Sequence, residues 1–438
     1  MDMPHWPALL ADQPVSLMRG WLPSVVQVLA GAMLVYAICG RNRRWLLQWL
    51  PVAVLSGVGV AASAHWYVLS EGLSDNPSPP LLWIWIGLTG VALVVLLLGW
   101  RGTHLWRRGA CLLAVPLCFI SLGLTLNSWV GYTPTIQTAW YQLTSGPLPD
   151  QSDLASITKL GPNGTPPPRG NVVTVTIPDT ASGFKHRDEL VYLPPAWTAA
   201  TPPPQFPAVM MIGAVLQDPA DWVRIGNAVT TADDFAAHHG GNAPVLVFVD
   251  ATGEFDNDTE CVNGPRGNSA DHLVKDVVPF INSQFGTSPR AANWGVVGFS
   301  SGGTCAIDLT VMHPDVFSTF VDIAGDLAPN SGSKAETIDR LFGGNADAYD
   351  AFDPTTVISR HGPYVGVSGW FPAPSGDTDN GNVLCGLARS NGIDCSVAAL
   401  PGQHDWPFAA TAFADSLPWL AGQLGTPGAP RVPMPAAS

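Results

Sequence analysis

The hydrophobic residues of this chain follow one pattern in its first third and a different one afterwards. Up to residue 132, four apolar runs are each on the order of 20 residues long, the length that an α-helix needs to cross a bilayer. These runs are Leu22–Cys39, Trp45–Leu69, Leu81–Trp100 and Gly109–Val130. None contains Asp, Glu, Lys or Arg, the usual markers of a transport pathway, so we expect a four-helix membrane anchor.

Beyond residue 171, short apolar runs alternate with amphipathic segments, as strands and helices do in a sheet covered on both faces. The predicted strands are Val172–Ile177, Glu189–Leu193, Pro207–Gly213, Pro244–Asp250, Gly295–Val297, Phe317–Ile323, Tyr364–Ser368 and Cys395–Leu400. The predicted helices are Ala228–His239, Asp271–Phe285, a segment opening at Gly302, Val383–Ser390 and Ala409–Leu424. The alternation predicts a mostly parallel α/β sheet whose active site lies at the carboxyl ends of its strands.

These patterns predict four regions. Residues 1–132 form the four-span transmembrane anchor, and residues 133–171, which are polar and contain three consecutive prolines, form a linker. Residues 172–425 form the α/β domain, and residues 426–438, rich in Pro and Ala, form a tail that we expect to be disordered.

The charges orient the anchor and limit the partners. Residues 1–132 carry seven Arg or Lys and four Asp or Glu, whereas residues 133–438 carry thirteen and thirty. Apart from Arg19, the arginines of residues 1–132 lie between the first two spans and between the last two, so the positive-inside rule places both links in the cytoplasm. The α/β domain is then expected on the extracytoplasmic side of the cell membrane. Its acidic balance argues against a nucleic-acid partner, and the sequence identifies no protein partner.

A G-x-S-x-G motif at Gly298–Gly302 lies between a predicted strand and a predicted helix. In this context the central serine, Ser300, is expected on a sharp turn at the edge of the sheet, where side chains on its neighbours would clash. The helix that follows directs its N-terminal N–H groups toward the place where an oxyanion would form. Ser300 is therefore the candidate nucleophile.

A serine hydroxyl needs a base, and the base needs an acid to orient it. In this architecture the order along the chain is serine, acid, histidine. His404 follows the last predicted strand and is the candidate base, whereas His313 lies on the helix after the motif and His361 precedes a strand. The acid is expected after the strand Tyr364–Ser368, and we favour Asp377 with Asp379 as the alternative.

An oxyanion hole needs two N–H donors. The residue after the nucleophile, Ser301, is expected to supply one. The turn after the strand Pro207–Gly213 is expected to supply the other, and Ala214 is the candidate there.

Residues from about 172 to 424 resemble the esterase D / antigen 85 family of α/β-hydrolases. The resemblance rests on L-V-Y-L-P-P-A-W (190–197), V-V-G-F-S-S-G-G (296–303), H-P-D-V-F (313–317) and P-G-Q-H-D-W (401–406). The four-helix anchor is similar to that of membrane-bound actinobacterial members. The resemblance implies a serine hydrolase or acyltransferase that forms an acyl-enzyme, with Ser300 as nucleophile, His404 as base, and Asp377 or Asp379 as acid.

One departure concerns substrate. Antigen 85 mycolyltransferases carry D-G-L-R after the third strand, where charged residues help bind trehalose, and this chain has I-G-A-V at 212–215. The resemblance therefore does not extend to trehalose mycolyl transfer as the specific reaction. An ester with an apolar acyl or aryl group remains the expected substrate.

The seven cysteines agree with this topology. Three lie in the apolar runs, and four lie in the α/β domain, an even number suited to an oxidising compartment. Four cysteines allow three pairings, of which we favour Cys385 with Cys395 and Cys261 with Cys305. No zinc-type cysteine spacing is present, and the alternating acids Asp256, Asp258 and Glu260 lack the glycine and closing glutamate of a calcium loop. We expect no metal and no cofactor.

Two classes of function follow. In the first, the chain is a membrane-anchored extracytoplasmic serine esterase or acyltransferase that acts on a lipid or acyl ester of the cell envelope. In the second, it is a catalytically silent hydrolase fold that serves as a binding or assembly module. An intact serine, histidine and candidate acid favour the first.

Overall fold

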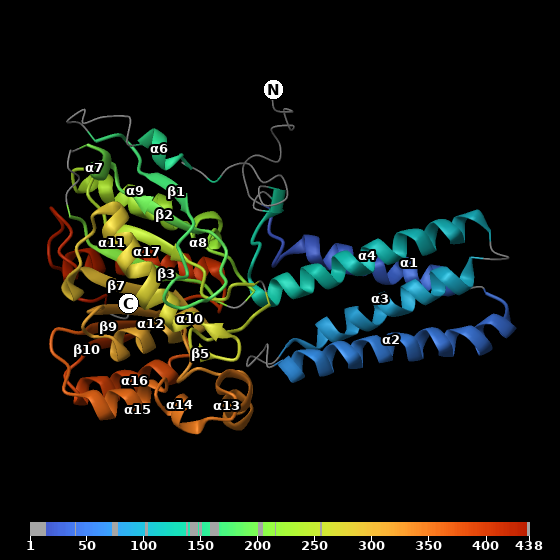
Figure 1. The fold of residues 1–438 in the computed structure, drawn as a ribbon. Helices are drawn as coiled ribbons and strands as arrows, with labels where there is room; N and C mark the ends of the chain where they lie inside the picture. Colours follow the sequence, from blue (N-terminus) through green and yellow to red (C-terminus); the bar gives the residue numbers. More distant parts are fainter. Residues whose placement is uncertain are drawn as a thin grey trace. The chain divides into compact units, whose positions relative to one another are not determined.

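The computed structural model describes residues 15–39, 41–71, 78–100, 104–136, 139–140, 148, 151–157, 166–199, 205–214, 216–254 and 256–435. Contacts divide the chain into two compact units, Met1–Thr144 and Ser145–Ser438. The first unit contains the apolar helices, and the second contains the sheet (Figure 1).

The first unit consists of four helices that are long and apolar enough to cross a membrane. They are α1 (Trp21–Ile38), α2 (Arg43–Glu71), α3 (Pro80–Gly99) and α4 (Leu105–Val130), so all four predicted runs are helical. Glycines bring α2 and α3 close together, since a Cβ on Gly90 would lie 3.0 Å from the Cα of Gly57. Such small-residue contacts are typical of helices that pack within lipid, where burial of apolar area gives little driving force.

The second unit is built on an eight-stranded sheet in the order β1-β2-β4-β3-β7-β8-β9-β10. The strands are β1 (Asn171–Val175), β2 (Glu189–Leu193), β3 (Ala208–Ile212), β4 (Val245–Val249), β7 (Trp294–Phe299), β8 (Thr319–Ile323), β9 (Ser368–Pro374) and β10 (Asp394–Leu400). The pairs β1–β2 and β2–β4 are antiparallel, and all the others are parallel. Strands β3, β4, β7 and β8 are buried along their whole length, which explains the unbroken apolar sequences of β3 and β4.

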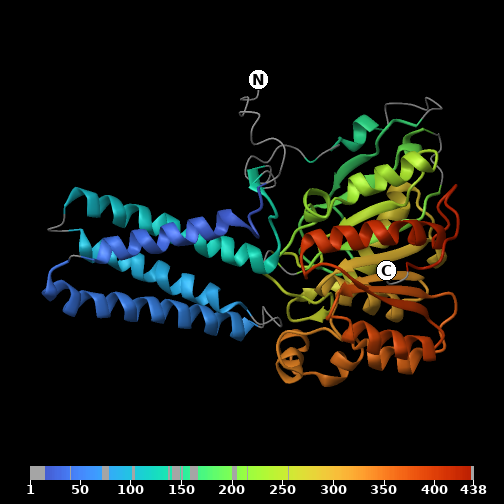
Figure 2. The same ribbon diagram turned by 180° about the vertical axis from the view of Figure 1, so that it is seen from behind.

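Helices cover both faces of this sheet, as predicted. Helices α9 (Ala228–His238) and α17 (Trp406–Gln423) contact each other on one face (Figure 2). The other face carries α11 (Val278–Phe285), α12 (Ser301–Met312), α15 (Pro354–His361) and α16 (Asp379–Ser390) (Figure 1). Shorter elements complete the unit: α6 (Leu154–Ile157), α7 (Pro195–Thr198), α8 (Asp221–Arg224), α10 (Ser269–Asp271), the π-helix η2 (His272–Val277), the 3₁₀-helix η3 (Ala291–Asn293), α13 (Lys334–Phe342), α14 (Ala346–Asp350), and the hairpin of β5 (Asn263–Gly264) and β6 (Gly267–Asn268).

The sequence misplaced one strand and did not predict α13, α14 and α15. The predicted strand Tyr364–Ser368 ends where β9 begins, and β9 continues to Pro374. The added part of β9 includes Pro372 and Pro374, and proline cannot donate within a sheet. Strand β8 pairs with β9 only as far as Trp370, so these two prolines lie beyond the part of β9 that pairs with β8.

Two segments expected to be irregular are packed on the second unit. Within the predicted linker, Ser152 N–H donates to the carbonyl of Val172 (2.9 Å), and Ile157 is buried in the core of the second unit. Within the predicted disordered tail, Thr426 N–H donates to Ala421 (2.9 Å), and the Pro430 carbonyl packs over Gly422. A side chain at 422 would fill the space that Pro430 occupies, so the glycine makes this packing possible.

Two disulfides cross-link the second unit, Cys261–Cys305 and Cys385–Cys395, and these are the pairs favoured by the sequence. The first joins the segment after β4 to α12 across 44 positions, and the second joins α16 to β10 across 10. Cys111 and Cys118, in α4, are free and buried.

Removing the longer cross-link should destabilise the second unit more. Loop-closure entropy gives about 4 kcal/mol for the Cys261–Cys305 loop and about 3 kcal/mol for the Cys385–Cys395 loop. We expect the double variant Cys261→Ser/Cys305→Ser to unfold at a lower temperature than Cys385→Ser/Cys395→Ser, measured by thermal denaturation of the full chain in detergent. The reverse order of unfolding temperatures would mean that local packing, and not loop length, determines how much each disulfide stabilises the unit.

Candidate active site

Ser300 lies at the sharp turn between β7 and α12, in a left-handed backbone conformation with φ 58° and ψ −125°. Its N–H donates to the carbonyl of Ile323, the last residue of β8 (2.9 Å). A methyl group on Gly298 would overlap the carbonyl oxygen of Gly302, and one on Gly302 would overlap the carbonyl of Ile212. The two glycines of the motif are therefore required by backbone contacts, as is typical of a nucleophile elbow.

The His404 side chain reaches Ser300 from the loop between β10 and α17. Its Nε2 lies 2.9 Å from Ser300 Oγ, although the two residues are 104 positions apart. The imidazole packs on the ring of Phe299, with 5.0 Å between centroids. Burial lowers the pKa of His404 below its ordinary value, and the charges of Asp377 and Asp405 partly offset this effect. A neutral imidazole in this position can accept the serine proton.

The structure places one of the two candidate acids beside His404. Asp377 Oδ2 lies 4.0 Å from His404 Nδ1, which is longer than a hydrogen bond, and the Asp377 side chain is 58% exposed. Asp379 is the first residue of α16, a position where the helix dipole stabilises a carboxylate. Asp405 accepts from Phe408 N–H (3.0 Å) and caps α17.

The other two histidines after Ser300 occupy helix ends. His313 is the C-cap residue of α12, at the opposite end of that helix from Ser300. His361 is the last residue of α15 and lies in its final turn. Neither position is part of the turn that carries Ser300.

The candidate oxyanion donors lie on neighbouring segments. Ser301 begins α12. The Gly213 carbonyl lies 2.7 Å from where a Cβ on Gly302 would be, so the turn after β3 packs directly on the start of α12. Ala214 N–H donates to the side-chain oxygen of Gln217 (2.8 Å). An oxyanion at this amide would have to replace Gln217 as the acceptor.

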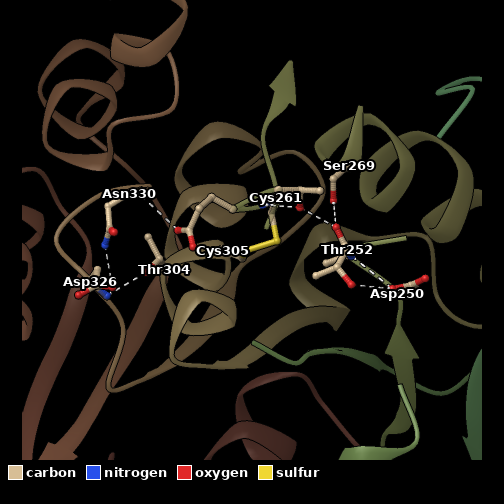
Figure 3. The surroundings of a disulfide bond; sticks show 11 residues. Asp250, Thr252, Cys261, Ser269, Thr304, Cys305, Asp326 and Asn330 are labelled. Carbon is tan, nitrogen blue, oxygen red and sulfur yellow. Dashed lines mark hydrogen bonds between the residues drawn. A yellow bond between two sulfur atoms is a disulfide. The ribbon is translucent and has the colours of Figure 1, made fainter. Parts of the chain in front are cut away.

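A disulfide ties the segment after β4 to α12. Figure 3 shows Cys261 bonded to Cys305, which lies in the second turn of α12. Farther along the same segment, the Ser269 hydroxyl donates to the carbonyl of Ala251 (2.6 Å). On the other side of α12, Thr304 Oγ1 accepts from Asp326 N–H (2.8 Å). The loops after β4 and β8 are therefore both attached to α12 close to Ser300.

Buried carboxyl groups lie along α12. Asp322, on β8, is 3% exposed, and its Oδ1 accepts from Gly325 N–H (2.8 Å) beside Gly303. Burial raises the pKa of Asp322 to about 7. Asp308, within α12, is also buried, and burial together with the charges of Asp322 and Asp353 raises its pKa well above the ordinary value. We have no structural account of why α12 retains Asp308.

Three residues of this region were not found from the sequence. Phe299 supports the His404 ring, Gln217 holds the Ala214 amide, and Asp322 lies under the start of α12. Phe299 and Asp322 belong to apolar strands and read as core positions. Gln217 lies in a polar turn, and nothing in its spacing indicates its contact with Ala214.

Comparison with known proteins gives a family match and several relatives. Residues 185–376 match the family model described as "Putative esterase". A protein of Corynebacterium glutamicum, described only as uncharacterized, is 26% identical over 420 residues, covering 91% of this chain and 95% of the relative. That match therefore includes residues of both compact units of this chain.

Solved structures with similar folds include esterases. An S-formylglutathione hydrolase from Agrobacterium tumefaciens is 15% identical with a TM-score of 0.48, covering 58% of this chain and 95% of that chain. A ferulic acid esterase is 16% identical with a TM-score of 0.47, covering 58% and 99%. MPT51 of Mycobacterium tuberculosis is 20% identical with a TM-score of 0.40, covering 57% and 98%.

The raised pKa of Asp322 predicts a stability that falls as pH rises. The folded chain holds this proton up to about pH 7, and the unfolded chain releases it near pH 4. The contribution of Asp322 to the free energy of unfolding is therefore greatest below pH 4. It falls as the pH rises toward 7, by up to about 4 kcal/mol.

Asp322→Asn should remove this loss while keeping the acceptor for Gly325. We expect its unfolding midpoint in urea to exceed that of the wild type at pH 8 and to approach it at pH 5. Asp339→Asn, on the exposed face of α13, is the control and should leave the pH dependence unchanged. An Asp322→Asn midpoint that follows the wild type at both pH values would contradict the assignment.

Proposed function

We propose that this chain, whose residues 185–376 match the family model "Putative esterase", is a membrane-anchored serine esterase or acyltransferase that acts through Ser300, His404 and Asp377. The observation that carries the proposal is the 2.9 Å contact between His404 Nε2 and Ser300 Oγ at a strained strand-to-helix turn. Strain of this kind costs on the order of 1–3 kcal/mol and persists mainly where function requires it.

The reaction would proceed in two steps. His404 Nε2 takes the proton from Ser300 Oγ as the oxygen attacks the ester carbonyl, and it then returns the proton to the leaving alcohol. This leaves an acyl group on Ser300. Water or a second alcohol, deprotonated by the same nitrogen, then attacks the acyl carbon and restores the free serine.

The amides of Ser301 and Ala214 would stabilise the negative charge that develops on the carbonyl oxygen. Because Ala214 N–H is bonded to Gln217, the substrate oxygen would exchange with the Gln217 side-chain oxygen as the site is occupied. Asp377 would move closer by about 1 Å to hydrogen-bond to His404 Nδ1, a tightening common on substrate binding. Its exposed side chain leaves room for this movement.

The substrate class follows from the surroundings of the site. The turn after β3 carries no charged side chain at 212–215, which suits an apolar acyl or aryl group better than a sugar anchored by ion pairs. Four apolar helices would hold the domain at a membrane, with the arginine-rich links on the cytoplasmic side and the domain outside. We therefore propose a lipid or acyl ester of the cell envelope as the substrate.

Labelling by a fluorophosphonate probe tests the nucleophile. We expect the full chain in detergent to form one phosphonyl adduct on Ser300, and Ser300→Ala to lose it, because the alcohol is the attacking group. Mass spectrometry of the tryptic peptide locates the adduct. Ser359→Ala, an exposed serine of α15, is the control and should label like the wild type.

Wild-type protein that folds but takes up no label would favour a silent binding module instead. An adduct on Ser300 after incubation with envelope lipids would in addition give the mass of the acyl donor.

The two aspartates are separated by a pH profile of kcat/KM on an aryl ester. Asp377→Asn should lower kcat/KM by roughly 10²- to 10⁴-fold, because the imidazole loses its orienting carboxylate. The acidic limb of the kcat/KM profile should also move to lower pH in Asp377→Asn. The charge of Asp377 raises the pKa of His404, and the variant lacks that charge. Asp379→Asn is the matched control and should leave kcat/KM and the acidic limb of its pH profile unchanged. If Asp379→Asn shows the loss and the shift, and Asp377→Asn does not, the acid is Asp379.

A further inference from the structure

A second cluster of reactive side chains is buried at the start of β2. His186 lies just before that strand, Glu189 begins it, and His272 begins the π-helix η2. The Glu189 and His272 side chains are fully buried, and that of His186 is 6% exposed. One donor atom from each of the three lies within 4.8 Å of the others. Neither Ser300 nor His404 belongs to this cluster.

The donor atoms converge on one carboxylate oxygen. Glu189 Oε1 lies 2.8 Å from His272 Nε2 and 3.3 Å from His186 Nδ1. The carbonyl oxygen of Arg187 lies 2.8 Å from His186 Nδ1 and adds a fourth donor. Four donors at about 2.0–2.2 Å from a tetrahedral zinc ion are roughly 3.3 Å apart, a spacing close to the two distances from Glu189 Oε1 to the imidazoles.

The outer nitrogen of each imidazole already faces an acceptor. His186 Nε2 lies 2.9 Å from the carbonyl of Ile177. His272 Nδ1 lies 3.5 Å from Asp276 Oδ2, and the amides of Ala181 and Ser182 hold that carboxylate in place. Metal-binding histidines characteristically donate their second N–H to a carbonyl or carboxylate in this way.

With a neutral His186, the hydrogen bonding of the cluster is incomplete. His186 faces carbonyl oxygens from both ring nitrogens, and a neutral imidazole has only one N–H to donate. Glu189 Oε2 is buried and has no hydrogen-bond partner. Buried polar atoms are normally satisfied, so unpaired ones indicate a missing ligand.

We infer that His186, Glu189 and His272, with the Arg187 carbonyl, form a structural site for a first-row divalent cation such as Zn²⁺. Two imidazoles and a carboxylate are ligands that suit Zn²⁺, and a fully enclosed set of protein donors is typical of structural sites. On binding, the His272 proton moves from Nε2 to Nδ1, where Asp276 accepts it. His186 keeps its Nε2 proton and releases to solvent any proton on Nδ1. The stacked rings, 4.1 Å apart, turn so that both nitrogens face the cation.

The site has a physical connection to the catalytic region. Arg187, between two ligands, pairs with Asp250 at the end of β4 (2.7 Å) and donates to the carbonyl of Gln217 (2.9 Å). Gln217 in turn holds the Ala214 amide. A cation that fixes the segment 186–189 therefore also fixes the turn that would supply an oxyanion donor. The inference itself rests on the cluster and not on the proposed activity.

The test measures metal in the full chain purified in detergent without chelators. We expect about one zinc per chain by inductively coupled plasma mass spectrometry, and a lower unfolding temperature after removal with dipicolinate that Zn²⁺ restores. Glu189→Gln and His272→Gln should retain less than about a tenth of the zinc. His313→Gln, outside the cluster, is the matched control and should retain it all.

Cobalt substitution keeps the test decisive if a ligand variant fails to fold. Co²⁺ added to the stripped wild type should give the visible absorption of a four-coordinate nitrogen–oxygen site. Stripped wild-type chain that neither binds Zn²⁺ or Co²⁺ nor gains thermal stability from them would overturn the inference. Zinc retained in full by folded Glu189→Gln and His272→Gln would overturn it as well, because the metal would then lie elsewhere.

Discussion

The second unit depends on one close backbone contact, the turn at Ser300. The chain leaves β7 and enters α12 through a left-handed residue, and this is possible only because Gly298 and Gly302 lack side chains. The start of α12 therefore packs directly on the turn after β3, and it also lies beside Asp322 of β8. The carboxyl ends of three neighbouring strands thus meet at one serine, and a side chain at either glycine would separate them.

Around this turn, different physical forces hold different parts of the site. His404 is positioned by packing on Phe299 and by its bond to Ser300, so its place depends on the core. Asp377, in contrast, is exposed and lies beyond hydrogen-bond range of the imidazole. The disulfide Cys261–Cys305 attaches a neighbouring loop to α12 covalently. The candidate site therefore combines a direct contact between Ser300 and His404 with an Asp377 side chain that is exposed and farther away.

The cluster of His186, Glu189 and His272 is connected to the turn after β3 through Arg187. Its residues flank Arg187, whose guanidinium reaches both Asp250 and the carbonyl of Gln217. Burial of two imidazoles and a carboxylate is costly unless their polar atoms are satisfied, and this cost is part of the reason for the cation that we infer there. The candidate oxyanion turn is therefore contacted both by the start of α12 and by Arg187.

The sequence by itself determined the features that follow from local periodicity and steric rules. Apolar runs about 20 residues long gave the four helices, unbroken apolar runs gave the buried strands, and G-x-S-x-G between a strand and a helix gave the turn at Ser300. Only the tertiary structure decided which residues meet. It placed Asp377, and not Asp379, next to His404, bonded the Ala214 amide to Gln217, and extended β9 through two prolines beyond its pairing with β8. It also brought Glu189 to His272 across 83 positions. Such contacts depend on how strands and loops from distant parts of the chain pack, and a linear pattern carries no record of that packing.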